Sequence, residues 1–184
     1  MSSPHNVTEP DVGSDPARMG TVATPTEDGK AFILNGDKQW CTNVTDPKTT
    51  MIAVLARTPD KVLPNGKKIP QISCFVETAW PGVERVRRST FMGLRGIANG
   101  SVTFKNVRVP AENIIGKPGE GLKIALATLN VGRLGLPAAA IGVGMAFVDD
   151  ARWWVTTRQQ WGQPVGKHQA IARMISSYAA HLFA

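Results

Sequence analysis

The chain has 184 residues, 42% of them hydrophobic, and a formal net charge of +7. This length allows one domain, or one domain and part of another, and the apolar content is ordinary for a globular chain with a buried core. No apolar run approaches the roughly 20 residues that span a bilayer, and the N-terminus lacks the basic and apolar regions of a secretory signal. Cys41 and Cys74 have no CxxC spacing, so we expect two reduced thiols rather than a metal site or a disulfide.

Up to about residue 115, short apolar segments lie between Gly and Pro turns, a pattern typical of a β domain. Phe32-Ile33-Leu34 runs into Asn35-Gly36, which predicts a tight turn with Trp40 on its far side. Further strands are expected at residues 50–56, 72–76 and 101–104, with an exposed loop at 64–68 and a closing segment at 106–110. Strands of this length and spacing predict an antiparallel sandwich or small barrel.

After Gly116-Lys117-Pro118-Gly119 the apolar residues take up helical spacing. The segment 122–129 predicts a helix, and the apolar-rich stretch 131–157 predicts more helix with a break or new start near Pro137. A further helix is expected from His168 to Ala184, and its apolar face comprises Ile171, Met174, Ile175, Tyr178 and Leu182. The expected fold class is α+β, a β-barrel or sandwich followed by part of a helical bundle.

The positive charge is compatible with nucleic acid, an anionic membrane or a phosphate-bearing ligand. Arg85, Arg87, Arg88 and Arg95 form a loose cluster, but aromatic residues that could stack on bases do not alternate with them. A solvated surface is the favoured interpretation, and we expect no nucleic-acid partner.

The most specific signal is a series of short motifs in a fixed order. Two polar loops about thirty residues apart come first, Val7-Thr8-Glu9-Pro10-Asp11-Val12-Gly13-Ser14-Asp15 and Gln39-Trp40-Cys41-Thr42-Asn43. Met92-Gly93-Leu94-Arg95-Gly96, residues 102–110 and 119–123, Leu129-Asn130-Val131-Gly132-Arg133, residues 158–164 and His168-Gln169 follow. The series resembles the acyl-CoA dehydrogenase family. The resemblance implies a fragment without the family's N-terminal helical domain, made of the middle β domain (1–116) and the start of the C-terminal helical domain (117–184).

By this resemblance the two polar loops bind FAD, whose ring the protein must orient and tune. Val7 and Thr8 would meet the pyrimidine side of the isoalloxazine ring, Trp40 would form a wall beside it, and Thr42 would lie next to the hydride-accepting N5. Ser14 would lie near the pyrophosphate and the bound acyl-CoA. The alternative is that Thr8 and Ser14 are turn residues and Trp40 belongs to the core.

Two further pairs match family positions. Arg158 and Gln169 correspond to residues that reach the flavin of a neighbouring subunit, where an arginine can clamp a phosphate and an amide can bond an adenine edge. Asn130 and Arg133 correspond to residues beside the pantetheine arm, and their i, i+3 spacing would put them on one helix face. The alternatives are a helix-end arginine, a surface glutamine and a surface helix start.

The resemblance implies oxidation of an acyl-CoA to a trans-2-enoyl-CoA, with electrons passed to an electron-transfer flavoprotein. The reaction needs a carboxylate to remove the α-proton. Most family members carry this glutamate in the C-terminal helical domain and a minority carry it immediately before the arginine equivalent to Arg133, where this chain has Gly132. Glu9 and Glu120 belong to a flavin loop and a helix start, so no residue is assigned as the base and we expect the chain itself to be inactive.

Three alternatives stay open: an acyl-CoA oxidase of the same fold, a nucleic-acid-associated flavoprotein relative, and a non-catalytic folding unit. Because Arg158 and Gln169 are assigned to another subunit's flavin, we expect a homotetramer or a homodimer. The expected location is the cytoplasm, or the mitochondrial matrix in a eukaryote, without a membrane span.

Overall fold

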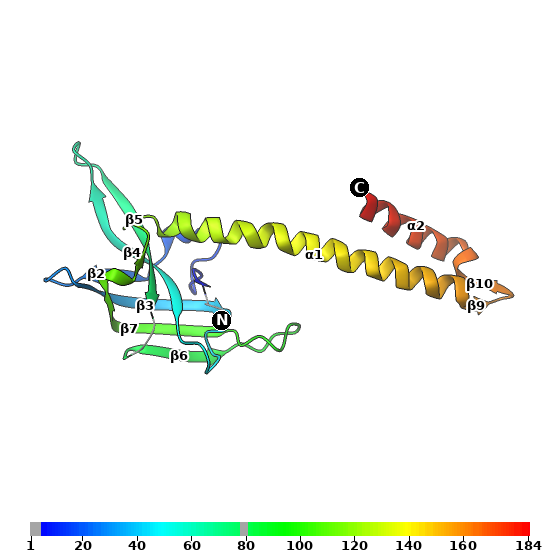
Figure 1. Ribbon diagram of the computed structural model, residues 1–184, viewed down its shortest axis with the longest axis horizontal. Helices are drawn as coiled ribbons and strands as arrows, with labels where there is room; N and C mark the ends of the chain where they lie inside the picture. The colour runs from blue at the N-terminus through cyan, green and yellow to red at the C-terminus, as the bar shows by residue number, and fades with distance from the viewer. Residues whose placement is uncertain (1–4, 78–80) are drawn as a thin grey trace. The chain divides into compact units, whose positions relative to one another are not determined.

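The computed structural model describes residues 5–77 and 81–184 (Figure 1). It divides into two compact units, Met1–Thr128 and Leu129–Ala184. The first unit consists of a curled β-sheet and the first turns of a long helix, and the second is helical with one small hairpin. The predicted α+β class is confirmed.

Eight strands form one sheet in the order β6-β7-β3-β2-β4-β5-β8, with β1 paired to β4. Neighbouring strands are antiparallel except for the β1–β4 and β2–β4 pairs. The strands are β1 (His5–Asn6), β2 (Val22–Pro25), β3 (Ala31–Cys41), β4 (Ile52–Val62), β5 (Lys68–Glu77), β6 (Val83–Arg88), β7 (Gly100–Pro110) and β8 (Ile114–Ile115), with 3-10 turns η1 (Pro16–Arg18) and η2 (Ala111–Asn113). β2 and β6 are strands that the sequence reading missed.

Strand β4 is central and buried on both faces. Ile52, Val54 and Ala56 pack into one apolar cluster, whereas Ala53 and Leu55 pack into a second cluster on the opposite face. This follows from the period-2 alternation of side chains along a strand. A strand with both faces covered reads as a continuous apolar run, which is how residues 50–56 were recognised.

The second apolar cluster is completed by the first turns of helix α1 (Gly121–Thr157). Leu122 and Ala125 pack against it. A Cβ atom at Gly121 would lie 2.4 Å from the carbonyl carbon of Ser73, so only glycine lets the helix begin this close to β5. The division between the two compact units falls at Thr128, inside the helix, and the domain boundary expected near residue 116 stays a prediction.

The predicted turn at Asn35-Gly36 is wrong, because β3 continues through both residues. The β2–β3 hairpin turns instead between Pro25 and Ala31. The extra residue lies in the partner strand β7, where Asn106 has a φ of 50° and the register shifts opposite Leu34 and Gly36. The Asn106 amide N–H donates to Asn35 Oδ1 at 2.8 Å, so the asparagine side chain stabilises a β-bulge.

Gly36 is required by a close approach. A Cβ atom there would lie 2.6–2.8 Å from atoms of Thr21, and its φ of 143° is unfavourable for other residues.

Two buried thiols lie in this unit. Cys41 ends β3 and Cys74 lies in β5, and both are free. Burial raises the pKa of Cys41 to about 12 and that of Cys74 to about 11, so both stay protonated thiols at neutral pH.

The second unit contains the rest of α1, a hairpin of β9 (Gln159–Gln160) and β10 (Gln163–Pro164), the 3-10 turn η3 (Val165–Lys167) and helix α2 (Gln169–Phe183). The expected break near Pro137 is wrong, since α1 passes through this residue without interruption. Proline lacks the N–H that would bond the Arg133 carbonyl, so the helix loses one backbone hydrogen bond here. The neighbouring Leu134 and Leu136 are exposed, and no packing among the described residues explains why the helix continues.

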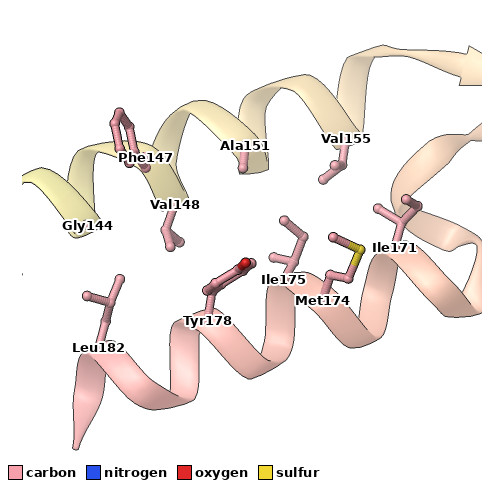
Figure 2. A pocket seen from close by; sticks show the side chains of 10 residues that line it. All are labelled: Gly144, Phe147, Val148, Ala151, Val155, Ile171, Met174, Ile175, Tyr178 and Leu182. Carbon is pink, nitrogen blue, oxygen red and sulfur yellow. The ribbon is translucent and has the colours of Figure 1, made fainter. Parts of the chain in front are cut away.

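The apolar face predicted for α2 lies against α1 (Figure 2). Together they line an apolar groove of about 580 Å³, formed by Gly144, Phe147, Val148, Ala151, Val155, Ile171, Met174, Ile175, Tyr178 and Leu182.

By length and composition alone, α1 is apolar enough to cross a membrane, with a mean hydropathy of 1.6 in its most apolar window. Its uncharged run, between Arg133 and Asp149, is nevertheless shorter than the roughly 20 residues that a span needs. The absence of a membrane span stays a prediction.

Candidate functional site

The first polar loop is attached to strand β3. The backbone N–H of Gln39 donates to the carbonyl of Thr8 at 2.9 Å, and Glu9 and Val12 exchange backbone hydrogen bonds that close a tight turn between them. The loop therefore lies next to the Trp40–Thr42 segment, as the site prediction requires. In the part of the chain that the structure describes, neither the N–H nor the hydroxyl of Thr8 has a hydrogen-bond partner.

A buried ion pair holds the loop in this position. Lys38 Nζ lies 2.7 Å from Glu9 Oε1, and the two side chains are 0% and 7% exposed. The backbone N–H groups of Gly20 and Thr21 also donate to the Glu9 carboxylate. Both carboxylate oxygens of Glu9 thus accept hydrogen bonds that fix the loop, which favours a structural role for this residue over that of a catalytic base.

Burial and hydrogen bonding act in opposite directions on this pair. Burial raises the pKa of Glu9, but hydrogen bonds from Lys38, Thr21 and Gly20 outweigh it, so the pKa lies below its ordinary value. For Lys38, burial lowers the pKa and the Glu9 carboxylate offsets part of that effect. The carboxylate is thus ionised across the neutral range, and the ammonium is its main donor.

Trp40 is turned outward by a β-bulge. Lys38 pairs with Val102 and Cys41 pairs with Gly100, so β3 carries one extra residue in between. Trp40 takes a φ of 58° at this bulge, which leaves its side chain 56% exposed while Cys41 points into the core. Strict alternation would have placed Trp40 on the same face as Lys38. The alternative that Trp40 belongs to the core is therefore wrong.

Among the described residues, the exposed indole has Phe91 as its aromatic neighbour, with ring centroids 6.5 Å apart and planes tilted by 31°. Thr42 follows in an exposed turn, and its hydroxyl has no hydrogen-bond partner among the described residues. A flat ring and a hydroxyl that is unpartnered within the described part of the chain thus lie at one end of β3, which suits a planar aromatic ligand with a polar edge.

Ser14 lies further along the first polar loop and is exposed. It lines an open depression of about 490 Å³ together with Asp11, Val12, Gly13, Asp15 and Arg18. Arg18 was not selected from the sequence, because an isolated arginine after a turn carries no distinctive pattern. Its guanidinium adds positive charge to a surface that the resemblance assigns to phosphate groups.

In the second unit, Arg158 and Gln169 lie at the same end of the two helices. Arg158 follows the last residue of α1, and its carbonyl accepts a hydrogen bond of 2.8 Å from the Val165 N–H. Gln169 begins α2 and is exposed.

The intervening β9–β10 turn has Trp161 and Gly162 at φ of 51° and 77°. These are the positive φ values of a type I′ hairpin turn. The Trp161 ring contacts the ring of His168 with centroids 5.3 Å apart. His168 lies within 3.3 Å of the Gln163 amide and of the Gln160 carbonyl, so this histidine organises the hairpin.

Asn130 and Arg133 lie on one face of α1, as their spacing predicts. The guanidinium of Arg133 donates to Asn130 Oδ1 at 3.0 Å, and both residues are exposed. Gly132, between them, has nothing within 4 Å of where a Cβ would be. Glu120 accepts a hydrogen bond from the Lys117 N–H at 3.2 Å and closes the turn before α1.

The residues of the first unit fit a flavin. The unpartnered Thr8 N–H can donate to a carbonyl or ring nitrogen, the exposed Trp40 can stack on a planar ring, and Arg18 can meet a phosphate. The roles of Val7, Thr8, Ser14, Trp40, Thr42, Arg158, Gln169, Asn130 and Arg133 toward cofactor and substrate stay predictions.

Sequence reasoning missed Lys38 as part of the site. The available signal was the alternation of side chains between the two faces of a strand. Lys38 stands an even number of residues after the apolar Leu34, so it falls on the buried face of β3. A lysine at a buried strand position needs a carboxylate partner, and Glu9 is the buried one among the described residues.

Comparison with known proteins agrees with the motif series. The family model for the acyl-CoA dehydrogenase middle domain matches residues 5–107, and the model for the acyl-CoA dehydrogenase C-terminal domain matches residues 119–184. The probable acyl-CoA dehydrogenase FadE10 of Mycobacterium tuberculosis is 51% identical over 181 residues, which are 97% of this chain and 27% of that protein.

Two solved structures are also similar. Butyryl-CoA dehydrogenase from Megasphaera elsdenii superposes with a TM-score of 0.82 and 32% identity over 98% of this chain and 45% of that chain. An acyl-CoA dehydrogenase from Bacillus anthracis in complex with FAD has a TM-score of 0.81 and 28% identity, covering 98% of this chain and 30% of that chain. The chain thus spans less than half the length of these relatives.

Both units carry a family match, and the first match alone covers more than half of the residues. The chain belongs to the acyl-CoA dehydrogenase family, whose members are FAD-dependent enzymes.

Proposed function

We propose that the chain is the flavin-binding part of an FAD-dependent acyl-CoA dehydrogenase that oxidises an acyl-CoA to a trans-2-enoyl-CoA. The observation that carries this proposal is the junction of the two polar loops. The Gln39 N–H···O=C Thr8 hydrogen bond joins them, and the β-bulge beside it turns Trp40 outward. A backbone donor that has no partner among the described residues and an exposed indole therefore lie next to each other beside the sheet.

Each residue has a binding role in this proposal. Val7 and Thr8 hold the pyrimidine edge, Trp40 forms a wall on one ring face, and Thr42 lies by N5. FAD, when bound, supplies the acceptor for the substrate hydride. Arg158 and Gln169 hold the nucleotide part of a flavin in a neighbouring subunit, which gives the assembly its homotetrameric or homodimeric form.

For the substrate, Ser14 contacts the acyl-CoA, and Asn130 and Arg133 contact its pantetheine arm. The α-proton needs a carboxylate acceptor within hydrogen-bond reach. Gly132 offers no side chain, Glu9 is paired with Lys38, and Glu120 caps the turn before α1. We therefore place the base outside this chain, in the remainder of the complete protein. In this proposal the complete protein passes its electrons to an electron-transfer flavoprotein. It does so in the cytoplasm or, in a eukaryote, in the mitochondrial matrix.

The test uses the complete protein that carries this chain. It should purify with about one FAD per subunit and oxidise at least one of butyryl-, octanoyl- and palmitoyl-CoA with a dye or an electron-transfer flavoprotein as acceptor. The isolated 184-residue chain should show only background turnover. Stoichiometric hydrogen peroxide without an external acceptor would identify an acyl-CoA oxidase instead. A complete protein that neither binds FAD nor bleaches its flavin with any acyl-CoA would refute the proposal.

A further inference from the structure

Lys38 and Glu9 are the two charged side chains that are buried among the described residues. The Lys38 ammonium has three neighbours: Glu9 Oε1 at 2.7 Å, the Val7 carbonyl oxygen at 3.3 Å and Met19 Sδ at 3.9 Å. Its donors are thus directed at the carboxylate and at one backbone carbonyl of the flavin loop.

That carbonyl belongs to the peptide group that joins Val7 to Thr8. The same planar group carries the Thr8 N–H, which points away from the carbonyl oxygen because the peptide is trans. A cation on the carbonyl oxygen draws electron density from the peptide and makes its N–H a stronger donor, as in any chain of polarised hydrogen bonds. The Thr8 N–H has no partner within the described residues, so its strengthened donor is free for a ligand.

Stability alone does not account for a buried ion pair at this point. Desolvating two charges costs several kcal/mol per ion, and apolar side chains of similar size often give equal or greater stability. Unlike this pair, the Lys105–Glu84 pair at 2.9 Å lies on the surface, with side chains 61% and 54% exposed. The side-chain hydrogen bond of the surface pair joins Lys105 to Glu84, and neither residue belongs to a polar loop, so this pair is a matched control.

We propose that Lys38, held by Glu9, is a positioning residue that fixes and polarises the Val7–Thr8 peptide, so that the Thr8 N–H donates to the edge of the flavin that becomes electron-rich on reduction. The inference rests on the proposed FAD binding. It assigns to the pair the function of favouring the reduced cofactor, in addition to joining the loop to β3. Glu9 keeps the ammonium in place and neutralises the pair, so the loop gains a directed dipole without net charge.

The experiment compares three variants of the complete protein with the wild type. Lys38→Met removes the cation but leaves Glu9 buried without a partner, and this variant is expected to lose stability. The double variant Glu9→Gln with Lys38→Met leaves no unpaired buried charge, so we expect it to fold. The control is the double variant Glu84→Gln with Lys105→Met. The readouts are the unfolding midpoint, the FAD dissociation constant after reconstitution of the apoprotein, and the flavin midpoint potential.

The buried double variant should bind oxidised FAD less tightly than the wild type does. Its loss of affinity for reduced FAD should be about tenfold greater than its loss for oxidised FAD. This difference lowers the midpoint potential by about 30 mV for a two-electron couple. The control should match the wild type in all three readouts. If the buried double variant folds and matches the wild-type dissociation constant and potential, the pair has only a structural role and the inference is wrong. If the wild-type complete protein binds no FAD, the proposed function is wrong and this inference falls with it, an outcome distinct from a buried double variant that binds FAD like the wild type.

Discussion

The side-chain amide of Asn99 donates a hydrogen bond of 2.8 Å to the backbone carbonyl of Trp40. Asn99 is buried just before β7, and its own carbonyl accepts a hydrogen bond from the Ser89 N–H. Trp40 has a φ of 58°, which is unfavourable for a bulky residue. The asparagine therefore stabilises the conformation that exposes the indole.

Asn99→Ala should lower the free energy of unfolding by about 1 kcal/mol, the typical net value of one hydrogen bond. It should also weaken FAD binding, since Trp40 loses the contact that holds its bulge. Urea unfolding and a flavin titration of the complete protein measure both effects. The matched control is Asn65→Ala, which removes only the 3.0 Å hydrogen bond from the Lys67 N–H to Asn65 Oδ1 in an exposed loop. Equal effects of the two substitutions on FAD binding would contradict the role given to Asn99.

Acid should destabilise the protein through Glu9. Burial raises the pKa of this carboxyl, but hydrogen bonds from Lys38, Thr21 and Gly20 bring it below the ordinary value of 4.5. A lowered folded-state pKa contributes stability above the unfolded-state pKa, and this stability is lost as pH falls through the folded-state pKa. The free energy of unfolding should therefore decline as pH falls below about 4.5, and chemical unfolding at a series of pH values measures the decline.

Glu9→Gln should flatten this acid decline, because the variant has no carboxyl to protonate at that position. The control Glu84→Gln changes an exposed carboxyl, and its profile should follow the wild type. Asp28 also has a lowered pKa, from the Thr26 hydroxyl and the Lys30 N–H, and its effect should persist in both variants. An unchanged slope in Glu9→Gln would show that other groups cause the acid sensitivity.

Thr42→Val should change the flavin more than the fold. Thr42 is exposed and its hydroxyl has no hydrogen-bond partner among the described residues, so the free energy of unfolding should stay within about 0.5 kcal/mol of the wild type. In the complete protein, loss of the hydroxyl beside N5 should shift the flavin potential and absorption spectrum. Thr24→Val, at an exposed position of β2, is the control. A large loss of stability with an unchanged spectrum would make Thr42 a structural residue.

Arg158→Ala should reduce FAD retention without unfolding the sheet. Arg158 is exposed at the end of α1 and takes part in no ion pair within the described residues, so its removal leaves no buried charge behind. Gel filtration of the complete protein, with the ratio of flavin to protein absorbance, measures retention and assembly together. Arg173→Ala, an exposed change on α2, should retain FAD like the wild type. Equal retention in both variants would refute the assignment of Arg158 to the cofactor.

The sequence predicted the class of each segment better than the local breaks in the chain. Strands such as residues 50–56 and the helix from His168 onward carry a regular apolar pattern, so they were identified correctly. The turn at Asn35-Gly36 was wrong because this dipeptide can also lie opposite a β-bulge, where Asn106 supplies the bend. Pro137 predicted a break because proline removes one backbone hydrogen bond of a helix, yet α1 continues through this residue.

The candidate site shows the same limit. Thr8 and Trp40 were selected from motif order, but nothing in the local sequence indicates that one extra residue turns Trp40 outward. The Lys38–Glu9 pair joins positions 29 residues apart, and such a pairing depends on the register of the sheet. Only side-chain parity along β3 gave a hint of it.

The rates at which the two buried thiols, Cys41 and Cys74, react with a labelling reagent can be used to measure local and global opening of this fold. Because burial holds both as protonated thiols, neither should react with a thiol-specific reagent until its surroundings open. Cys41 follows Trp40 directly, so its labelling rate measures local opening of the candidate site. The labelling rate of Cys74, in β5, measures separation of the central strands. If FAD binds against Trp40, it should slow the labelling of Cys41. The labelling rate of Cys74 should stay at the value set by opening of the sheet. One reagent can therefore measure ligand binding and global unfolding in the same sample.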